Sequence, residues 1–157
     1  MKIFTDHKKY ILPVLNIITL CIVIFTISAF FIYKSNLIIG FVLILLSFLC
    51  FISLIPFKIK IKNIEPDIIF GLIDNGILTL LAILGGKIMG VTGAIIGGVI
   101  GNTMTDGIAG MFEGYWAERL RSKNIGEERL MLGSAVGKMA GCLLSAGVVF
   151  IIASFLF

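Results

Sequence analysis

The sequence predicts an all-α, polytopic membrane protein with five transmembrane helices, in which an N-terminal helical hairpin precedes a glycine-rich three-helix core. Of the 157 residues, 59% are hydrophobic and only 14% are charged, and the mean hydropathy is +1.12. Several apolar runs reach the length of about 20 residues that a helix needs to cross a bilayer. Aromatic side chains stand near the expected helix ends, where membrane interfaces favour them: Tyr10, Tyr33, Tyr115 and Trp116.

The N-terminal domain, residues 1–62, is expected to be a plain transmembrane hairpin and a linker. Its helices are predicted at 10–33 and 37–57, with the turn at 34–36. The first run is too long for the apolar core of a signal peptide and another run follows at once, so we expect the first helix to be retained. The linker KIKIKNIEPD, residues 58–67, alternates charge with isoleucine. It is expected to lie along the headgroup surface or to form a short extended connection.

The C-terminal domain, residues 63–157, differs in composition because it is rich in glycine. It is expected to contain three helices, at 68–86, 91–116 and 130–157. Pro66 suits the first turn of the first of these helices. Glu65 and Asp67 are favoured there because the start of a helix carries partial positive charge.

Glycines recur every four residues in the last two of these helices. The two series are Gly93, Gly97 and Gly101, and then Gly133, Gly137 and Gly141 with Ser145 continuing the second. In lipid, helices associate through close packing of small residues, since one apolar surface gains little by leaving another. Three helices enclose little by themselves, so the stripes predict close helix contacts and a homodimer.

Basic residues predict the orientation in the membrane. Ten of them flank the expected helices on one side: Lys2, Lys8, Lys9, Lys58, Lys60, Lys62, Arg119, Arg121, Lys123 and Arg129. The opposite turns hold only Lys34 and Lys87. Because positive charge accumulates on the cytoplasmic side, the N-terminus is expected in the cytoplasm and the C-terminus outside. Topology accounts for the basic charge, so no nucleic-acid partner is predicted. The Ile- and Lys-rich chain has no recognisable presequence, which favours a prokaryotic plasma membrane.

Side chains for enzyme chemistry are scarce. His7, the single histidine, lies in the charged N-terminal tail, and the three cysteines, Cys21, Cys50 and Cys142, stand far apart within apolar segments. We expect these cysteines to be small buried side chains. No Ser/His, Cys/His or His-metal arrangement is present, so the sequence predicts neither an enzyme nor an organic cofactor.

Polar side chains nevertheless occur inside the apolar C-terminal helices. Asn102, Asp106 and Glu113 follow an i, i+4, i+11 spacing, which places them within roughly 40° of one another on one helix face. Asp74 and Lys138 each fall about 10 Å from the cytoplasmic end of their helix, and Asp106 about 15 Å. A charged side chain in hydrocarbon costs several kcal/mol unless it is paired, hydrated or turned to a cavity. We therefore expect the three ionisable groups to converge.

Two interpretations of this polar set stay open. In the first, Lys138 pairs with an aspartate and the network only fixes helix register. In the second, side chains supply oxygen ligands for a hard cation such as Ca²⁺ or Na⁺; the candidate ligands are Asp74, Asn75, Asn102, Thr105 and Asp106. Lys138 would then be the internal countercharge of the empty site. Glu113 is expected either to attract cations at the cytoplasmic mouth or to be a snorkelling surface residue.

Three motifs, GLIDNGI, GNTMTDGIAG and GKMAGC, occur in this order over about residues 68–150. They resemble the G-x-x-DN, GN-x-x-SD and GK-x-x-G motifs of the transmembrane protein 65 family. Animal members of that family are inner-mitochondrial-membrane proteins linked to sodium-dependent calcium efflux. The resemblance implies cation transport here, and the positions that match the motifs are Asp74, Asn75, Asn102, Thr105, Asp106 and Lys138.

The chain also departs from that family. Two additional apolar helices replace the polar region that precedes the helical core in animal members, so the N-terminal half inherits no role. Thr105 stands where the family has serine, which keeps the hydroxyl. Either Glu113 or Glu118 corresponds to the family's glutamate.

The function we expect is cation transport, specifically Na⁺-coupled Ca²⁺ movement by alternating exposure of an Asp74/Asp106 site. The transported ions are its only expected ligands, and its expected partners are the lipid bilayer and a second copy of the chain. Two alternatives remain. One is a non-transporting scaffold or assembly protein held by a buried polar network, and the other is a proton-coupled exporter of small molecules.

Overall fold

The computed structural model describes residues 7–122 and 131–156. The side chains described are those of residues 11–111, apart from 36 and 109, and of residues 131–156. Regular structure in this part of the chain is helical throughout. The elements are α1 (His7–Phe31), α2 (Asn36–Ser53), the short 3-10 helices η1 (Ile55–Phe57) and η2 (Ile61–Asn63), α3 (Glu65–Ser122) and α4 (Met131–Leu156).

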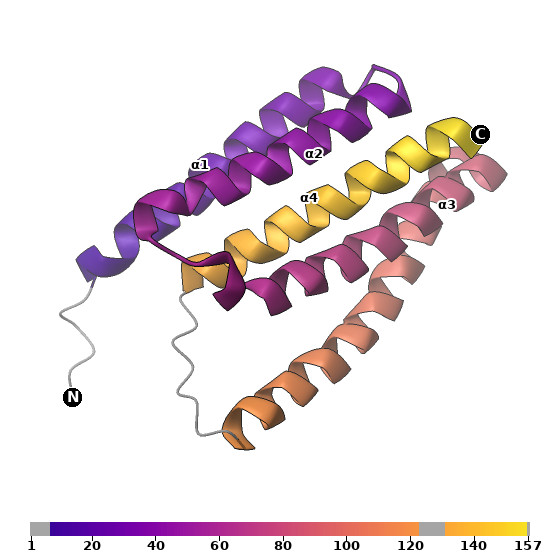
Figure 1. The fold of residues 1–157 in the computed structure, drawn as a ribbon. Coiled ribbons are helices and arrows are strands. Elements are labelled where there is room, and N and C mark those ends of the chain that lie inside the picture. Colours follow the sequence, from indigo (N-terminus) through magenta and orange to yellow (C-terminus); the bar gives the residue numbers. More distant parts are fainter. Residues whose placement is uncertain (1–6, 123–130, 157) are drawn as a thin grey trace.

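Helices α1 and α2 form the expected antiparallel hairpin (Figure 1). Ser35 caps α2, its Oγ accepting the backbone N–H of Ile38 at 3.5 Å. Near the other end of the hairpin the Asn16 amide donates to Ser53 Oγ at 3.4 Å. The predicted boundaries of both helices differ from the observed ones by a few residues. The predicted helix 37–57 is longer than α2 because residues 55–57 form η1 instead of extending α2.

The linker after α2 is not fully extended, because η1 and η2 coil most of it into short turns. Lys58 terminates η1 in a left-handed conformation, with φ 54°. Lys58, Lys60 and Lys62 are exposed, whereas Ile64 is 3% exposed. The linker therefore keeps its charges outside and anchors its last isoleucine in the protein.

Helix α4 lies between the α1–α2 hairpin and α3 and packs against both (Figure 1). On the α2 side, Ser47 Oγ donates to the Ala140 carbonyl at 2.8 Å. A methyl group added at Gly147 would lie 2.7 Å from the Gly40 carbonyl oxygen, so these two helices meet backbone to backbone. On the α3 side, Gly141 and Gly71 meet with similar closeness, since a methyl group on either glycine would lie 3.1 Å from the other's Cα.

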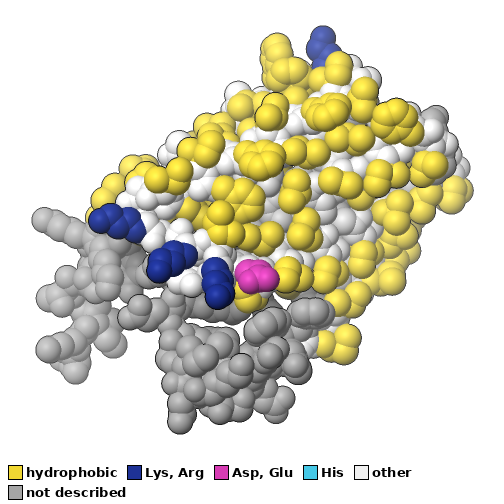
Figure 2. Space-filling view, in the orientation of Figure 1, with side chains coloured by type: hydrophobic (Ala, Val, Ile, Leu, Met, Phe, Trp, Pro, Cys, Tyr) yellow, Lys and Arg dark blue, Asp and Glu magenta, His cyan; other side chains and the backbone are white. Residues whose placement is uncertain are grey.

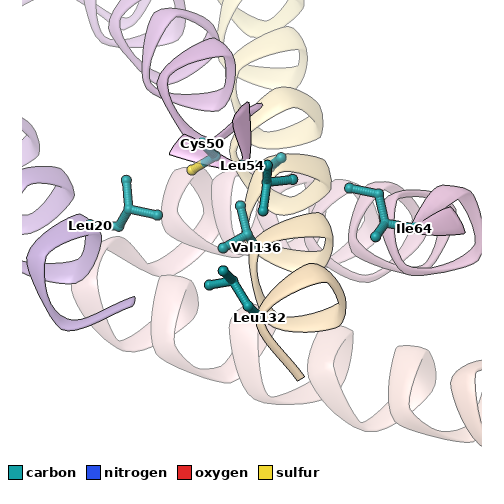
Figure 3. Close-up of a cluster of buried hydrophobic side chains, with 7 residues drawn as sticks. Leu20, Cys50, Leu54, Ile64, Leu132 and Val136 are labelled. Atoms are coloured by element: carbon teal, nitrogen blue, oxygen red, sulfur yellow. The ribbon is translucent and has the colours of Figure 1, made fainter. Parts of the chain in front are cut away.

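The buried apolar cluster lies where α1, α2 and α4 meet Ile64, the residue just before α3 (Figure 3). Its members are Leu20, Cys50, Leu54, Ile64, Leu132, Val136 and Ala140. Cys50 and Val136 have no exposed surface. Cys142 is half-buried and Cys21 is exposed, so the expectation that all three cysteines are buried holds for Cys50 and is wrong for Cys21.

Helix α3 is 58 residues long and reverses direction within its length. Met89 (φ −134°, ψ 22°) and Gly90 (φ 60°, ψ −139°) leave helical geometry. A positive φ favours glycine, which has no Cβ to clash with the backbone. The predicted helices 68–86 and 91–116 are thus the two arms of a helical hairpin that joins them without a loop. We call residues 65–88 the first arm and residues 91–122 the second arm.

Four helices of the described chain are long and apolar enough to cross a membrane, with candidate spans at 11–31, 37–57, 65–108 and 131–156. The face of the molecule in Figure 2 is largely apolar; a group of basic side chains lies at its lower end, and another basic side chain lies at the upper end. These features are compatible with an integral membrane protein. The 65–108 span covers the first arm of α3 and the second arm as far as Ile108.

Candidate functional site

The two arms of α3 contact each other along one stripe of the second arm. Its residues are Gly93, Gly97, Gly101 and Thr105, each of which is buried. A Cβ at Gly97 would overlap the Leu81 carbonyl, and one at Gly101 would lie 2.7 Å from Leu78 Cα. Only glycine allows this approach, so the first of the two glycine series predicted from the sequence brings the arms together.

Thr105 occupies the end of this stripe and is the point where the two acidic motifs meet. Its Oγ1 donates to Asp74 Oδ1 at 2.5 Å, and the side chain is 2% exposed. The same hydroxyl lies 3.0 Å from the Asn102 carbonyl oxygen. A hydroxyl has one proton, and the bond to a carboxylate is the stronger of the two because it is charge-assisted. Two predicted ligands, 31 residues apart in sequence, are therefore neighbours.

Asn102 and Asp106 lie beside this contact but on the exposed side of the second arm. The Asn102 amide donates to Asp106 Oδ2 at 2.9 Å, and both side chains are exposed. Asp106 follows Thr105 by one residue, or about 100° around the helix, so it points away from the stripe that Thr105 belongs to. The side chains of these two predicted ligands are thus hydrogen-bonded to each other.

The structure describes the side chain of only some of the remaining predicted site residues. Asn75 is half-buried in the first arm, next to Asp74. Glu113 and Glu118 fall outside the residues whose side chains the structure describes. In the part of the chain that is described, no group of three or more His, Cys, Asp or Glu side chains gathers closely enough to hold a metal ion.

Lys138 approaches the first arm of α3 from α4. It is half-buried, and its Nζ lies 4.2 Å from the centre of the Phe70 ring, within the range of a cation–π interaction. Its backbone carbonyl closely approaches Gly71 in the first arm, so Lys138 is level with that residue. Asp74 lies three residues further along the arm, and the predicted common level of Asp74 and Lys138 is correct to within about one turn.

One acidic residue that we did not predict as part of the site is Asp67. It is 3% exposed, and Ser134 Oγ on α4 donates to its Oδ1 at 2.7 Å. Sequence reasoning placed it only in the first turn of a helix. The signal that could have identified it is its spacing, because Asp67, Gly71 and Asp74 at i, i+4 and i+7 share one face of a helix.

Comparisons of this chain with protein-family models, with curated proteins and with solved structures found no match. The fold and the polar residues by themselves therefore define the class. It is an all-helical chain, compatible with an integral membrane protein, that carries carboxylates and an ammonium within its long apolar helices.

Proposed function

We propose that this chain is a membrane cation transporter that exchanges Na⁺ for Ca²⁺. The observation that carries the proposal is the contact between Thr105 and Asp74, which unites the two acidic motifs across the α3 hairpin. A carboxylate and a hydroxyl are hard oxygen donors of the kind that these cations prefer. The resemblance of the motifs to the transmembrane protein 65 family supports the same class of substrate.

The mechanism that we propose is alternating exposure of a site formed by Asp74 and Asp106. Asn75, Asn102 and Thr105 add neutral oxygen ligands, and Glu113 attracts cations at the cytoplasmic mouth. Two carboxylates against the Lys138 ammonium leave a net negative charge, which favours a cation. Sodium and calcium compete for the same carboxylates, which couples their movements.

We further propose that each arm of α3 crosses the membrane, giving five spans in a prokaryotic plasma membrane with a cytoplasmic N-terminus and an external C-terminus. What supports five spans is the reversal at Met89 and Gly90. The span 65–108 contains 44 residues, or about 66 Å of straight helix, which is roughly twice the thickness of the hydrocarbon core. The orientation rests on the distribution of basic residues.

A homodimer is part of this proposal because the described side chains of the second arm, within residues 91–111, are covered on only one side. Asn102 and Asp106 are exposed on it, and a Cβ at Gly98 would have no neighbour within 4 Å. An ionisable group facing hydrocarbon is costly. A second copy packed on this face would shield Asp106 and contribute its own carboxylate to the pathway.

A scaffold or assembly protein is the second candidate, and specific contacts favour it. Asp67 accepts a hydrogen bond from Ser134, and Asp106 accepts one from Asn102. Polar side chains that satisfy one another can fix helix register without binding any ion. In this role the polar residues would determine assembly and nothing would move across the membrane.

Purified protein in liposomes tests the proposal. Calcium uptake driven by a sodium gradient is measured for the wild type, Asp74→Asn, Asp106→Asn and the control Glu65→Gln, which removes an exposed carboxylate at the start of α3. We expect uptake in the wild type and the control and its loss in both aspartate variants, with all four proteins remaining folded and dimeric.

Three results would contradict the proposal. Wild-type vesicles without flux, combined with an Asp106→Asn protein that no longer assembles, would indicate the scaffold. Flux driven by a pH gradient without calcium dependence would indicate the proton-coupled exporter. Undiminished calcium uptake in Asp74→Asn would show that the Asp74 carboxylate does not bind the transported ion.

A further inference from the structure

Asp67 is a buried carboxylate that the proposed transport cycle leaves without a role. Although it lies in the first turn of α3, it does not face the aqueous end of the helix: its Cβ is 3.1 Å from the position that a Cβ on Gly137 would occupy. With 3% of its surface exposed, it is enclosed between the first arm and α4.

One hydroxyl does not satisfy a carboxylate in this position. An ionised carboxylate offers about four acceptor sites, and Ser134 fills one of them. A buried charge is stable when an opposite charge is within reach. Among the residues whose side chains the structure describes, Lys138 is a basic residue at this place in the fold, because it directly follows Gly137 and comes one helical turn after Ser134.

The Lys138 ammonium lies beside the part of the first arm that separates Asp67 from Asp74. Its Nζ lies over the Phe70 ring, 4.2 Å from the ring centre. Phe70 comes three residues after Asp67 and four before Asp74, so the ring marks a level about halfway between the two carboxylates, which are separated by about 10 Å along the helix axis. The lysine side chain has a flexible four-carbon stem, and the aromatic face attracts its charge between the two acids.

We propose that Asp67 is the alternative partner of Lys138: the ammonium neutralises Asp74 when the cation site is empty and moves past Phe70 to Asp67 when a cation binds at Asp74. This inference rests on the proposed transport function and adds a residue to it. Lys138 acts as a tethered competitor of the transported ion. Asp67 receives the displaced charge, so that the ammonium is paired with a carboxylate in both states and never faces hydrocarbon alone.

The test measures how calcium uptake into liposomes depends on calcium concentration, in Asp67→Asn and in the control Glu65→Gln, which lies two residues away and is exposed. In Asp67→Asn the ammonium has no second partner and stays on Asp74. We expect the calcium concentration for half-maximal uptake to rise by about tenfold or more, the scale set by one hydrogen-bonded charge, while the maximal rate persists. The control should match the wild type.

Removing Lys138 separates this role from a structural one. Lys138→Met lacks the competitor, so it should reach half-maximal uptake at a lower calcium concentration than the wild type. The double variant Asp67→Asn/Lys138→Met should reach half-maximal uptake at the same calcium concentration as Lys138→Met, because Asp67 has no role as a partner once the ammonium is absent. If Asp67→Asn alone fails to fold, the double variant, which buries neither charge, still tests whether Asp67 acts independently of the ammonium.

The remaining outcomes distinguish the two proposals. If the wild type transports calcium and Asp67→Asn behaves like Glu65→Gln, the inference is wrong and the transport function stands. If the double variant differs from Lys138→Met, Asp67 acts independently of the ammonium and the inference is again wrong. If the wild type carries no flux, the transport function fails and the inference fails with it.

Discussion

The Thr105 hydroxyl is central to the candidate site because it donates the hydrogen bond that connects the two arms of α3 at the level of Asp74. It is almost fully buried and donates to a carboxylate. Such a bond to a charged group contributes about 1.5–3 kcal/mol, more than a neutral hydrogen bond. The residue therefore contributes both to holding the hairpin and to positioning a ligand.

Replacing Thr105 with valine keeps the shape of the side chain and removes the hydroxyl. We expect Thr105→Val to lower the apparent cation affinity by about tenfold or more, because Asp74 loses its donor and the site loses a ligand oxygen. Thr105→Ser, the matched control, keeps the hydroxyl and should stay close to the wild type. Calcium dependence of uptake in liposomes provides the measurement; equal affinities for the two variants would show that the hydroxyl is not part of the site.

Sequence reasoning identified Asp74 and Thr105 correctly as side chains of one polar region, yet it could not decide which of their neighbours faced it. Asn102, Thr105 and Asp106 occur within five positions, and only the packing of the glycine stripe fixes which of them turns inward. Asp67 escaped detection for a related reason. Its burial depends on α4, which lies about 70 residues further along the chain and approaches through Gly137.

At the scale of the element, the packing of the α3 hairpin depends on a row of glycines, which have no side chain. The second arm buries Gly93, Gly97 and Gly101 against the first arm, while its large apolar residues, such as Val91 and Val99, remain exposed. The attraction between the arms therefore comes from close backbone packing and not from interdigitated large side chains. A single methyl group in this row should be enough to disturb it.

Gly97→Ala and Gly98→Ala form a matched pair that tests this packing. A Cβ at Gly97 would overlap the Leu81 carbonyl, whereas a Cβ at Gly98 meets nothing within 4 Å. We expect Gly97→Ala to destabilise the protein by about 1–3 kcal/mol, the usual cost of overpacking. Gly98→Ala should unfold like the wild type when the protein is monomeric. Thermal unfolding in detergent measures both, and a smaller effect at Gly97 than at Gly98 would contradict the packing of the arms.

The helices themselves were predictable because apolar runs, turn residues and glycine spacing all signal them locally. The prediction was wrong about the connection in the middle of α3, where we expected a gap between 86 and 91 and found helix up to Ile88. Residues 87–90, Lys-Ile-Met-Gly, lack the polar loop signal of the turn at 34–36. The reversal is achieved by two residues, Met89 and Gly90, and a positive φ at one glycine is too local a feature for hydropathy to detect.

At the scale of the whole molecule, α4 connects the two halves of the chain. It packs against α2 through Ala140 and Gly147 and against the first arm of α3 through Gly137 and Gly141. The division at residue 62 that composition suggested thus separates two sequence types that share one central helix. The second arm, in contrast, makes its closest contacts with the first arm.

Cysteine labelling can decide between four and five membrane crossings. In a protein freed of its native cysteines, Ser35→Cys and Met89→Cys should both react with a membrane-impermeant maleimide added outside cells, while Lys60→Cys should react only after permeabilisation. The reason is that the α1–α2 turn at residue 35 and the α3 reversal at residue 89 lie at one end of the molecule, and the linker with residue 60 lies at the opposite end (Figure 1). Protection of Met89→Cys on both sides would show that the reversal stays within the membrane.

The exposed side of the second arm leads to the last prediction, which concerns the dimer. Gly98, Asn102 and Asp106 follow one another at intervals of four residues, so a two-fold symmetric dimer would place this stripe against its own copy. Gly98→Cys, in a protein without native cysteines, should then form a disulfide between two copies on mild oxidation, since small residues let helix backbones approach within the Cα separation of about 7 Å that a disulfide requires.

Ile100→Cys is the control, because residue 100 lies about 200° further around the helix and is half exposed at 50%. Crosslinked dimer on a non-reducing gel is the readout. Equal crosslinking at the two positions, or at Ile100→Cys alone, would place the contact between copies elsewhere and leave Asp106 to be shielded by something other than a second copy.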